Sequence, residues 1–184
     1  MDKLAIQFAR DLRLVFDHTH SELDEAGIPF FYSFPKNACQ GASVFLGLFF
    51  TWLYPGAVIC IVKGSHRTKD EHHYWVELNA RVYDLTNDQF EPWLGETYQG
   101  LNVPVCAAKK HPLRNYFFYK KRESAIRAYA TFVTEHANLI DVDKAQWFII
   151  DKLREYGWNL AKTPEGNRLV NTRNHQPPIK IIAY

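Results

Sequence analysis

Residues 37–53 read Asn37-Ala-Cys-Gln-Gly-Ala-Ser-Val-Phe-Leu-Gly-Leu-Phe-Phe-Thr-Trp-Leu53, and this nearly uninterrupted apolar run decides the fold. A helix that is apolar on every side is a buried one. Asn37 is a favourable N-cap, and the run ends at Pro55 and Gly56 because proline is poorly tolerated inside a helix and glycine suits the turn after it. The sequence therefore predicts a central buried helix with Cys39 in its first turn.

The position of Cys39 favours a reactive thiol. The first turn of a helix presents unpaired N–H groups and the positive end of the dipole, both of which favour an anion such as a thiolate. The pKa of a thiol falls at a helix N-terminus, and it falls further beside an imidazolium. The small residues Gly41, Ala42 and Ser43 would leave room for a substrate. For an isolated cysteine, the ordinary alternative is a buried structural thiol.

Strands follow the helix. Residues Ala57–Val62 are apolar and mostly β-branched, which predicts a strand buried on both faces. After a polar loop at 64–71, the runs His73–Leu78 and Arg81–Leu85 indicate a hairpin that turns at Asn79-Ala80.

The register of this hairpin brings chemistry-bearing side chains together. A two-residue turn pairs Leu78 with Arg81 and Trp75 with Asp84. Because side chains alternate along a strand, His73 and Asp84 then share one face as diagonal neighbours. Such neighbours lie about 7–8 Å apart at the backbone, a gap that long side chains bridge.

The pairing suggests a Cys-His-Asp catalytic site. Asp84 would accept the Nδ1–H of His73 and leave Nε2 to deprotonate Cys39. His72 points to the opposite face of its strand. Although His66 and Asp70 lie nearby in the sequence, adjacent histidines on a strand point apart and no second spaced pair completes a tetrahedron. We therefore expect neither a metal nor a cofactor.

The chain has, in this order, a Cys on a helix, His-x-Trp-Val-Glu on a strand and Asp-x-Thr on the next strand. This order resembles the core of the transglutaminase-like superfamily, within the papain-like cysteine protease fold. The resemblance covers about the middle third of the chain. It implies that Cys39 is the nucleophile, His73 the base and Asp84 the orienting carboxylate. Trp75 belongs to the flanking pattern and is a candidate for the substrate cleft.

The oxyanion donors are less defined. Papain has a glutamine shortly before its nucleophile, whereas this chain has Ser33 at roughly that place. The backbone N–H of Cys39 is one donor, and the side chains of Asn37 and Gln40 or a tryptophan indole are candidates for a second.

The predicted fold class is α+β, with a papain-like or transglutaminase-like core in which the Cys39 helix packs on an antiparallel sheet. A chain of 184 residues is most simply one domain, 1–184. The catalytic core would span about 28–107, and a C-terminal helical portion, about 115–160, would pack on it.

Helices flank the core on both sides. An N-terminal amphipathic helix would bury a stripe that runs from Leu4 to Phe16. The C-terminal portion would hold one helix at 124–136 and a second helix capped by Asp141 or Asp143. Irregular loops with one short strand are expected between 89 and 115, and residues 179–183 are a candidate edge strand.

Composition restricts the function classes. The formal net charge is +2 with no long basic run, so nothing points to nucleic acid. The apolar run 42–53 is too short to span a bilayer, and no signal peptide is visible. Three cysteines (Cys39, Cys60 and Cys106) make no paired framework and suit the cytoplasm. Delivery to other cells as an effector or toxin stays open.

The functional hypothesis is a cysteine-dependent amide hydrolase, either a peptidase, an amidase or a deamidase, that acts on a peptide or protein through a thioester. An amine acceptor in place of water would make it a transglutaminase-type acyl transferase. Two other classes remain: a non-catalytic binding module on the same fold, and an interaction role for the C-terminal helices.

Overall fold

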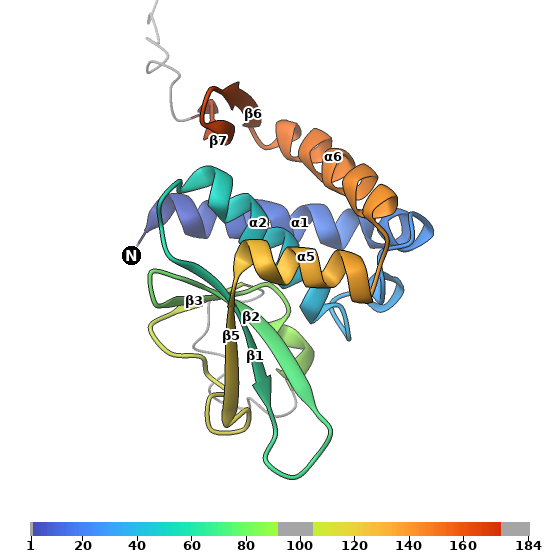
Figure 1. Cartoon of the computed structure of the whole chain (residues 1–184), viewed down its shortest axis with the longest axis vertical. Helices are drawn as coiled ribbons and strands as arrows, with labels where there is room; N and C mark the ends of the chain where they lie inside the picture. Colours follow the sequence, from blue (N-terminus) through green and yellow to red (C-terminus); the bar gives the residue numbers. More distant parts are fainter. Residues whose placement is uncertain (1, 92–104, 174–184) are drawn as a thin grey trace, which may run out of the picture.

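The computed structural model describes residues 2–91 and 105–173, and in these residues the protein is α+β (Figure 1). Its helices are α1 (Lys3–Glu25), α2 (Cys39–Leu53), α5 (Ala125–Glu135) and α6 (Leu139–Glu155). A five-stranded antiparallel sheet in the order β4-β3-β2-β1-β5 is formed by β1 (Ile59–Ser65), β2 (His72–Leu78), β3 (Arg81–Asp84), β4 (Cys106–Ala108) and β5 (Tyr119–Ser124). A separate hairpin pairs β6 (Trp158–Thr163) with β7 (Gly166–Asn171).

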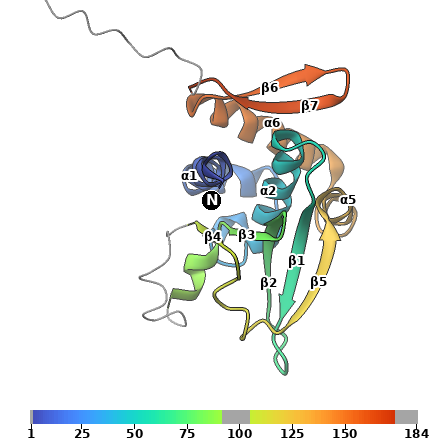
Figure 2. The ribbon, with the colours of Figure 1, turned by 90° about the vertical axis from the view of Figure 1, so that its left-hand side faces the viewer.

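Helix α2 is the central element, as the apolar run predicts. It contacts α1, α5, β1, β2 and β7, and Figures 1 and 2 show it between the sheet and the layer of α6 with the hairpin. Gly47 permits this packing, since a Cβ there would lie 2.5 Å from the Cδ1 of Ile61. The residues expected to make room for substrate are packed instead: a Cβ at Gly41 would lie 2.9 Å from the ring of Phe31.

The expected N-cap of α2 is wrong. Ala38 occupies the cap position, and no side chain makes a capping hydrogen bond. Asn37 lies one residue earlier in the left-handed region with φ 63°, a conformation that asparagine tolerates better than most residues. Among the described residues, no side chain therefore caps the N–H groups in the first turn of α2.

The hairpin register is confirmed. Leu78 pairs with Arg81 and Val76 with Tyr83. Asn79 and Ala80 both have positive φ, 48° and 61°, which is what the two-residue turn of type I′ requires. The strand predicted before the hairpin extends further than expected, to Ser65.

The core has two parts. The larger part surrounds α2 and includes the predicted stripe of α1, in which Phe8, Leu12 and Phe16 are fully buried. A smaller cluster packs around Trp75 and consists of Val62, Trp75, Val82, Phe90, Leu113 and Phe117.

The C-terminal helices are present, with one change of cap. Ser124 caps α5, but Asn138 caps α6 in place of Asp141 or Asp143, because its Oδ1 accepts the N–H of Asp141 at 2.9 Å. The β6–β7 hairpin was not anticipated. Residues 92–104 and 179–183, for which loops and an edge strand were expected, lie outside the described residues. In the part of the chain described, no helix has the length and apolar character needed to span a membrane.

Candidate active site

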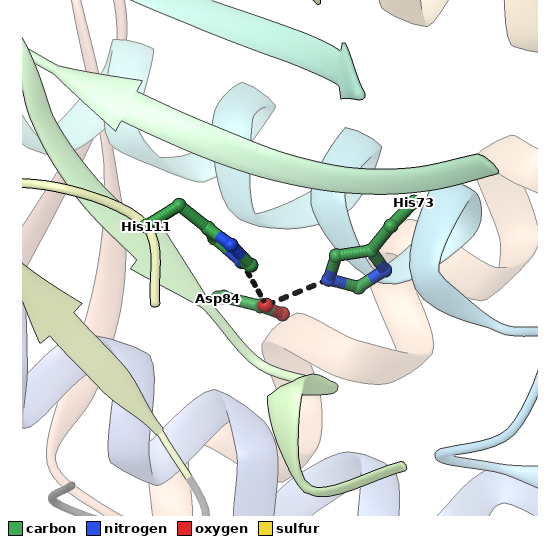
Figure 3. A group of neighbouring side chains, drawn as sticks. All are labelled: His73, Asp84 and His111. Carbon is green, nitrogen blue, oxygen red and sulfur yellow. Dashed lines mark hydrogen bonds and ion pairs between the residues drawn. The ribbon is translucent and has the colours of Figure 1, made fainter. Parts of the chain in front are cut away.

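Three buried polar side chains meet at the edge of the smaller core cluster. His73 comes from β2, Asp84 ends β3, and His111 lies in the loop between β4 and β5. All are almost inaccessible to solvent, with exposed fractions of 0%, 1% and 2%. Figure 3 shows Asp84 between the two imidazole rings. The Nε2 atoms of His73 and His111 lie 2.7 and 2.9 Å from the same carboxylate oxygen, Oδ2.

Asp84 is held as an anion. Its other oxygen, Oδ1, accepts the N–H of Thr86 at 2.8 Å and the hydroxyl of Thr86 at 3.2 Å. Burial alone would raise the pKa of this carboxyl group. The positive charge of His73 and the hydrogen bonds from both histidines outweigh burial, and the pKa of Asp84 lies well below its usual value.

His73 is held as a cation. Burial disfavours its charged form, but the charge and hydrogen bond of Asp84 outweigh that cost, Cys39 adds a smaller contribution, and the pKa of His73 rises to about 10. Aromatic rings enclose the imidazole: the centroids of Phe90 and Phe117 lie 4.6 and 5.5 Å from its own. Water is therefore kept from the ion pair, which strengthens it.

The imidazole of His73 is oriented opposite to the expectation. Nε2 donates to Asp84, whereas the sequence argument assigned that role to Nδ1. The reason is distance: Asp84 has a short side chain and is a diagonal neighbour, so only Nε2, the ring nitrogen farther from the β2 backbone, extends far enough to meet it. The nitrogen available for a thiol is thus Nδ1, which has no hydrogen bond of ordinary geometry among the described residues.

Cys39 is the first residue of α2, a free thiol with 8% exposure. It lies close enough to His73 to contribute to the raised pKa of that imidazole. The pKa of Tyr74 is raised to about 12, mainly by burial and next by the charge of Cys39. The described residues thus bring together a buried His73–Asp84–His111 group and a neighbouring thiol, without a closed hydrogen bond between Cys39 and His73.

Of the other predicted site residues, Trp75 packs against this group, whereas Asn37 and Gln40 are not part of it. Gln40 lines a cavity of about 420 Å³, whose wall also includes Tyr74. Asn37 is exposed on the turn before α2. Trp75, expected at the substrate cleft, is fully buried and stacks on His111 with ring centroids 4.3 Å apart.

Sequence reasoning missed His111. It follows two lysines, Lys109-Lys110, and precedes Pro112, so the segment has the composition of a surface loop. Its place in the site becomes visible only through its contacts with Trp75 on β2 and Asp84 on β3, which are distant in the sequence. A buried histidine in such a segment has no periodic pattern that would reveal it.

The three side chains also have the composition of a metal site. Their ligand atoms lie within 4.8 Å of one another, and two histidines with one carboxylate occur in catalytic zinc centres. A histidine that binds a metal donates its other N–H to an acceptor. Here the N–H of Leu113 donates to Nδ1 of His111 at 3.1 Å, so that nitrogen carries no proton. The surroundings therefore fit protons between the rings and the carboxylate better than a metal ion.

Comparisons of the chain with protein-family models, curated proteins and solved structures found no match. Function is accordingly inferred from the geometry of this chain.

Proposed function

We propose that the protein is a cysteine-dependent amide hydrolase that acts on a peptide or protein substrate, with Cys39 as the nucleophile and His73 as the proton carrier. One observation carries the proposal: the fully buried 2.7 Å hydrogen bond between His73 and Asp84 lies beside a thiol at a helix N-terminus. A nucleophile, a base and a group that orients the base are the parts that covalent acyl transfer needs.

The mechanism follows from the protonation states. A thiolate on Cys39 would be balanced by the imidazolium of His73, and its sulfur attacks the carbonyl carbon of the amide. Nδ1–H of His73 then protonates the leaving amine, and a thioester with Cys39 remains. Water attacks the thioester while His73 takes up its proton, and the carboxylic acid leaves as the thiolate re-forms.

The N-terminus of α2 supports the developing oxyanion. The first N–H groups of a helix lack intrahelical partners, and α2 has no side-chain cap that would occupy them. The backbone N–H of Cys39 is the first donor in this proposal, and Gln40 supplies a second. Stabilisation of the oxyanion by donors that are fixed in place is among the larger contributions to acyl-transfer catalysis.

The cavity beside Gln40 is the proposed place for the substrate. It holds about 420 Å³, and charged side chains of β5 and α5, among them Lys121, Glu123 and Arg127, line it. Gln40, the residue that follows Cys39 in the first turn of α2, lies in its wall, which supports a position near the thiol. A chemistry that depends on a free thiol suits a reducing compartment such as the cytoplasm.

The test follows three products at once. A mixed peptide pool is incubated with the wild type, with Cys39→Ala and with Cys60→Ala, which removes a half-buried free thiol on β1. New N-termini report hydrolysis, ammonia reports deamidation, and incorporation of an amine probe reports acyl transfer. We expect new N-termini from the wild type and Cys60→Ala, and a loss of about 10³-fold or more in Cys39→Ala. Turnover retained in Cys39→Ala would refute the nucleophile, and products of the other two kinds would replace hydrolysis by deamidation or transfer.

A further inference from the structure

We propose that His111 is a positioning residue of this site: it fixes the direction of Asp84 and thereby the orientation of His73. The inference rests on the proposed function, because a fixed imidazole is what the thiol requires. It starts from an unusual arrangement, in which two buried histidines donate to one carboxylate oxygen.

The proton on His111 can be placed. Burial has the largest effect and lowers the pKa of His111, the hydrogen bond and charge of Asp84 oppose it, and the charges of His73 and Lys120 lower it further; the net direction is downward, which favours a neutral ring. A neutral imidazole carries one proton. Because Nδ1 accepts the N–H of Leu113 at 3.1 Å, that proton lies on Nε2 and points to Asp84, 2.9 Å away.

The carboxylate is fully occupied as a result. Oδ1 accepts two hydrogen bonds from Thr86, and Oδ2 accepts one from each histidine. Two carboxylate oxygens offer about four acceptor directions, so all are used. Without His111, Oδ2 would keep only the contact with His73, and the two side chains could turn together.

The ring of His111 is itself fixed. Trp75 stacks on one face of the His111 ring, with centroids 4.3 Å apart and planes at 24°, and the centroid of His111 lies 5.5 Å from that of His73. If His111 only filled space, its stacking on Trp75 would matter, but its Nε2–H donor to Asp84 would not. This difference separates the two roles by experiment.

Two substitutions divide the ring from the donor. His111→Phe keeps an aromatic ring against Trp75 and removes the N–H, whereas His111→Gln removes the ring and keeps an amide N–H within reach of Asp84. His72→Phe is the matched control, since it removes an exposed histidine from the same strand as His73.

The first measurement is the ¹⁵N spectrum of the histidine side chains at neutral pH, with resonances assigned by the same variants. We expect His111 as a neutral ring protonated at Nε2. An imidazolium, or a ring protonated at Nδ1, would overturn the inference, and so would a bound zinc ion that metal analysis finds in the wild type but not in His111→Phe. This spectrum does not depend on any catalytic activity.

The second measurement is the rate of Cys39 alkylation by iodoacetamide at pH 6. We expect a loss of about tenfold or more in His111→Phe, recovery to within about threefold of the wild-type rate in His111→Gln, and no change in His72→Phe. Losing a donor also makes Asp84 more basic, so an increased rate in His111→Phe would show a role in charge rather than position and would overturn the inference. An unchanged rate, or no rescue by Gln, would do the same. If wild-type Cys39 does not react at pH 6, the proposed function fails, while the spectrum still decides the role of His111.

Discussion

At the scale of single residues, the pKa values of His73 and Asp84 shift in the directions opposite to those that burial alone produces. Burial lowers the pKa of a histidine and raises that of an aspartate, yet the His73 pKa is raised and the Asp84 pKa is lowered. For each group, the charge and the hydrogen bonds of its partners therefore outweigh the effect of burial on its pKa. Removal of either partner would leave an uncompensated buried charge, which typically costs several kcal/mol.

Asp84→Asn tests the orienting role. The amide cannot balance the imidazolium, so the pKa of His73 falls and the imidazole loses its fixed orientation. We expect kcat to fall about 10³-fold or more, with a lower unfolding temperature. Glu77→Gln is the control, because Glu77 forms its ion pair with Arg122 at the surface. Equal effects of the two substitutions on kcat would contradict the assigned role.

The raised pKa of His73 also predicts how stability depends on pH. An unfolded histidine titrates near pH 6.5, whereas folded His73 titrates near 10. Between these values the folded state binds one more proton, so the free energy of unfolding should fall with rising pH by up to about 1.4 kcal/mol per unit. Urea unfolding at pH 7, 8 and 9 measures this slope. In His73→Gln the contribution should vanish, and an identical slope in both proteins would show that folded His73 is not protonated.

At this scale, Cys39, His73 and Asp84 could be selected from the sequence as candidates, and the structure shows the pairing of His73 with Asp84, but the ring orientation of His73 and the presence of His111 could not be predicted. Selection needed only residue types and strand alternation. Orientation depends on which ring nitrogen reaches a diagonal neighbour, and His111 depends on a contact with a residue 27 positions away.

At the scale of elements, the segment after β3 is tied to α1 by a buried arginine. Arg13 donates from Nη1 to the carbonyl of Leu85 at 2.5 Å, and its two Nη atoms contact the carboxylate of Asp88 at 2.8 and 2.7 Å. Asp17 completes the ion-pair network one turn along α1. We call the contacts of Arg13 with Leu85 and Asp88 the Arg13 clamp. Because Leu85 follows Asp84 directly, this clamp also helps to fix the position of the Asp84 carboxylate.

Arg13→Met tests the clamp. It leaves Leu85 without a donor and Asp88 without its cation, and we expect a loss of about 2–4 kcal/mol in the free energy of unfolding. Cys39 alkylation at neutral pH should slow as Asp84 becomes less fixed. Arg10→Met, at an exposed position of the same helix, serves as control. A variant of Arg13 with unchanged stability would refute the clamp.

Elements with a local signal were predictable. The apolar run gave α2, and a two-residue turn gave the register of β2 and β3. The β6–β7 hairpin was missed because its stability comes from distant residues: Trp158 donates to Asp11 at 2.8 Å and packs on Phe8 with centroids 4.9 Å apart. The prediction that Asn37 caps α2 was wrong because Asn37 has a left-handed backbone conformation and lies one residue before the cap position, and no side chain caps the helix.

At the scale of the whole molecule, the fold packs a buried helix, α2, against β1 and β2 in the interior of the five-stranded sheet. The thiol, the imidazole and the carboxylate come from α2, β2 and β3, and α1 fixes the segment that follows the carboxylate. Packing around α2 leaves its first turn uncapped beside a cavity, which is where an attacking sulfur and an oxyanion would need to lie. The α+β class followed from the sequence, whereas the arrangement of the layers required the structure.

The most direct test of the account is the pH dependence of Cys39 alkylation by iodoacetamide in the wild type and in His73→Gln, which keeps a donor opposite Asp84. Peptide mapping gives the rate at each cysteine, with Cys60 as internal reference. We predict that Cys39 reacts rapidly below about pH 8, where ordinary thiols are mostly protonated, and that His73→Gln abolishes this reactivity. If Cys39 is inert, or if it follows the same pH profile as Cys60 in both proteins, the thiolate–imidazolium pair does not exist and the enzyme proposal is wrong.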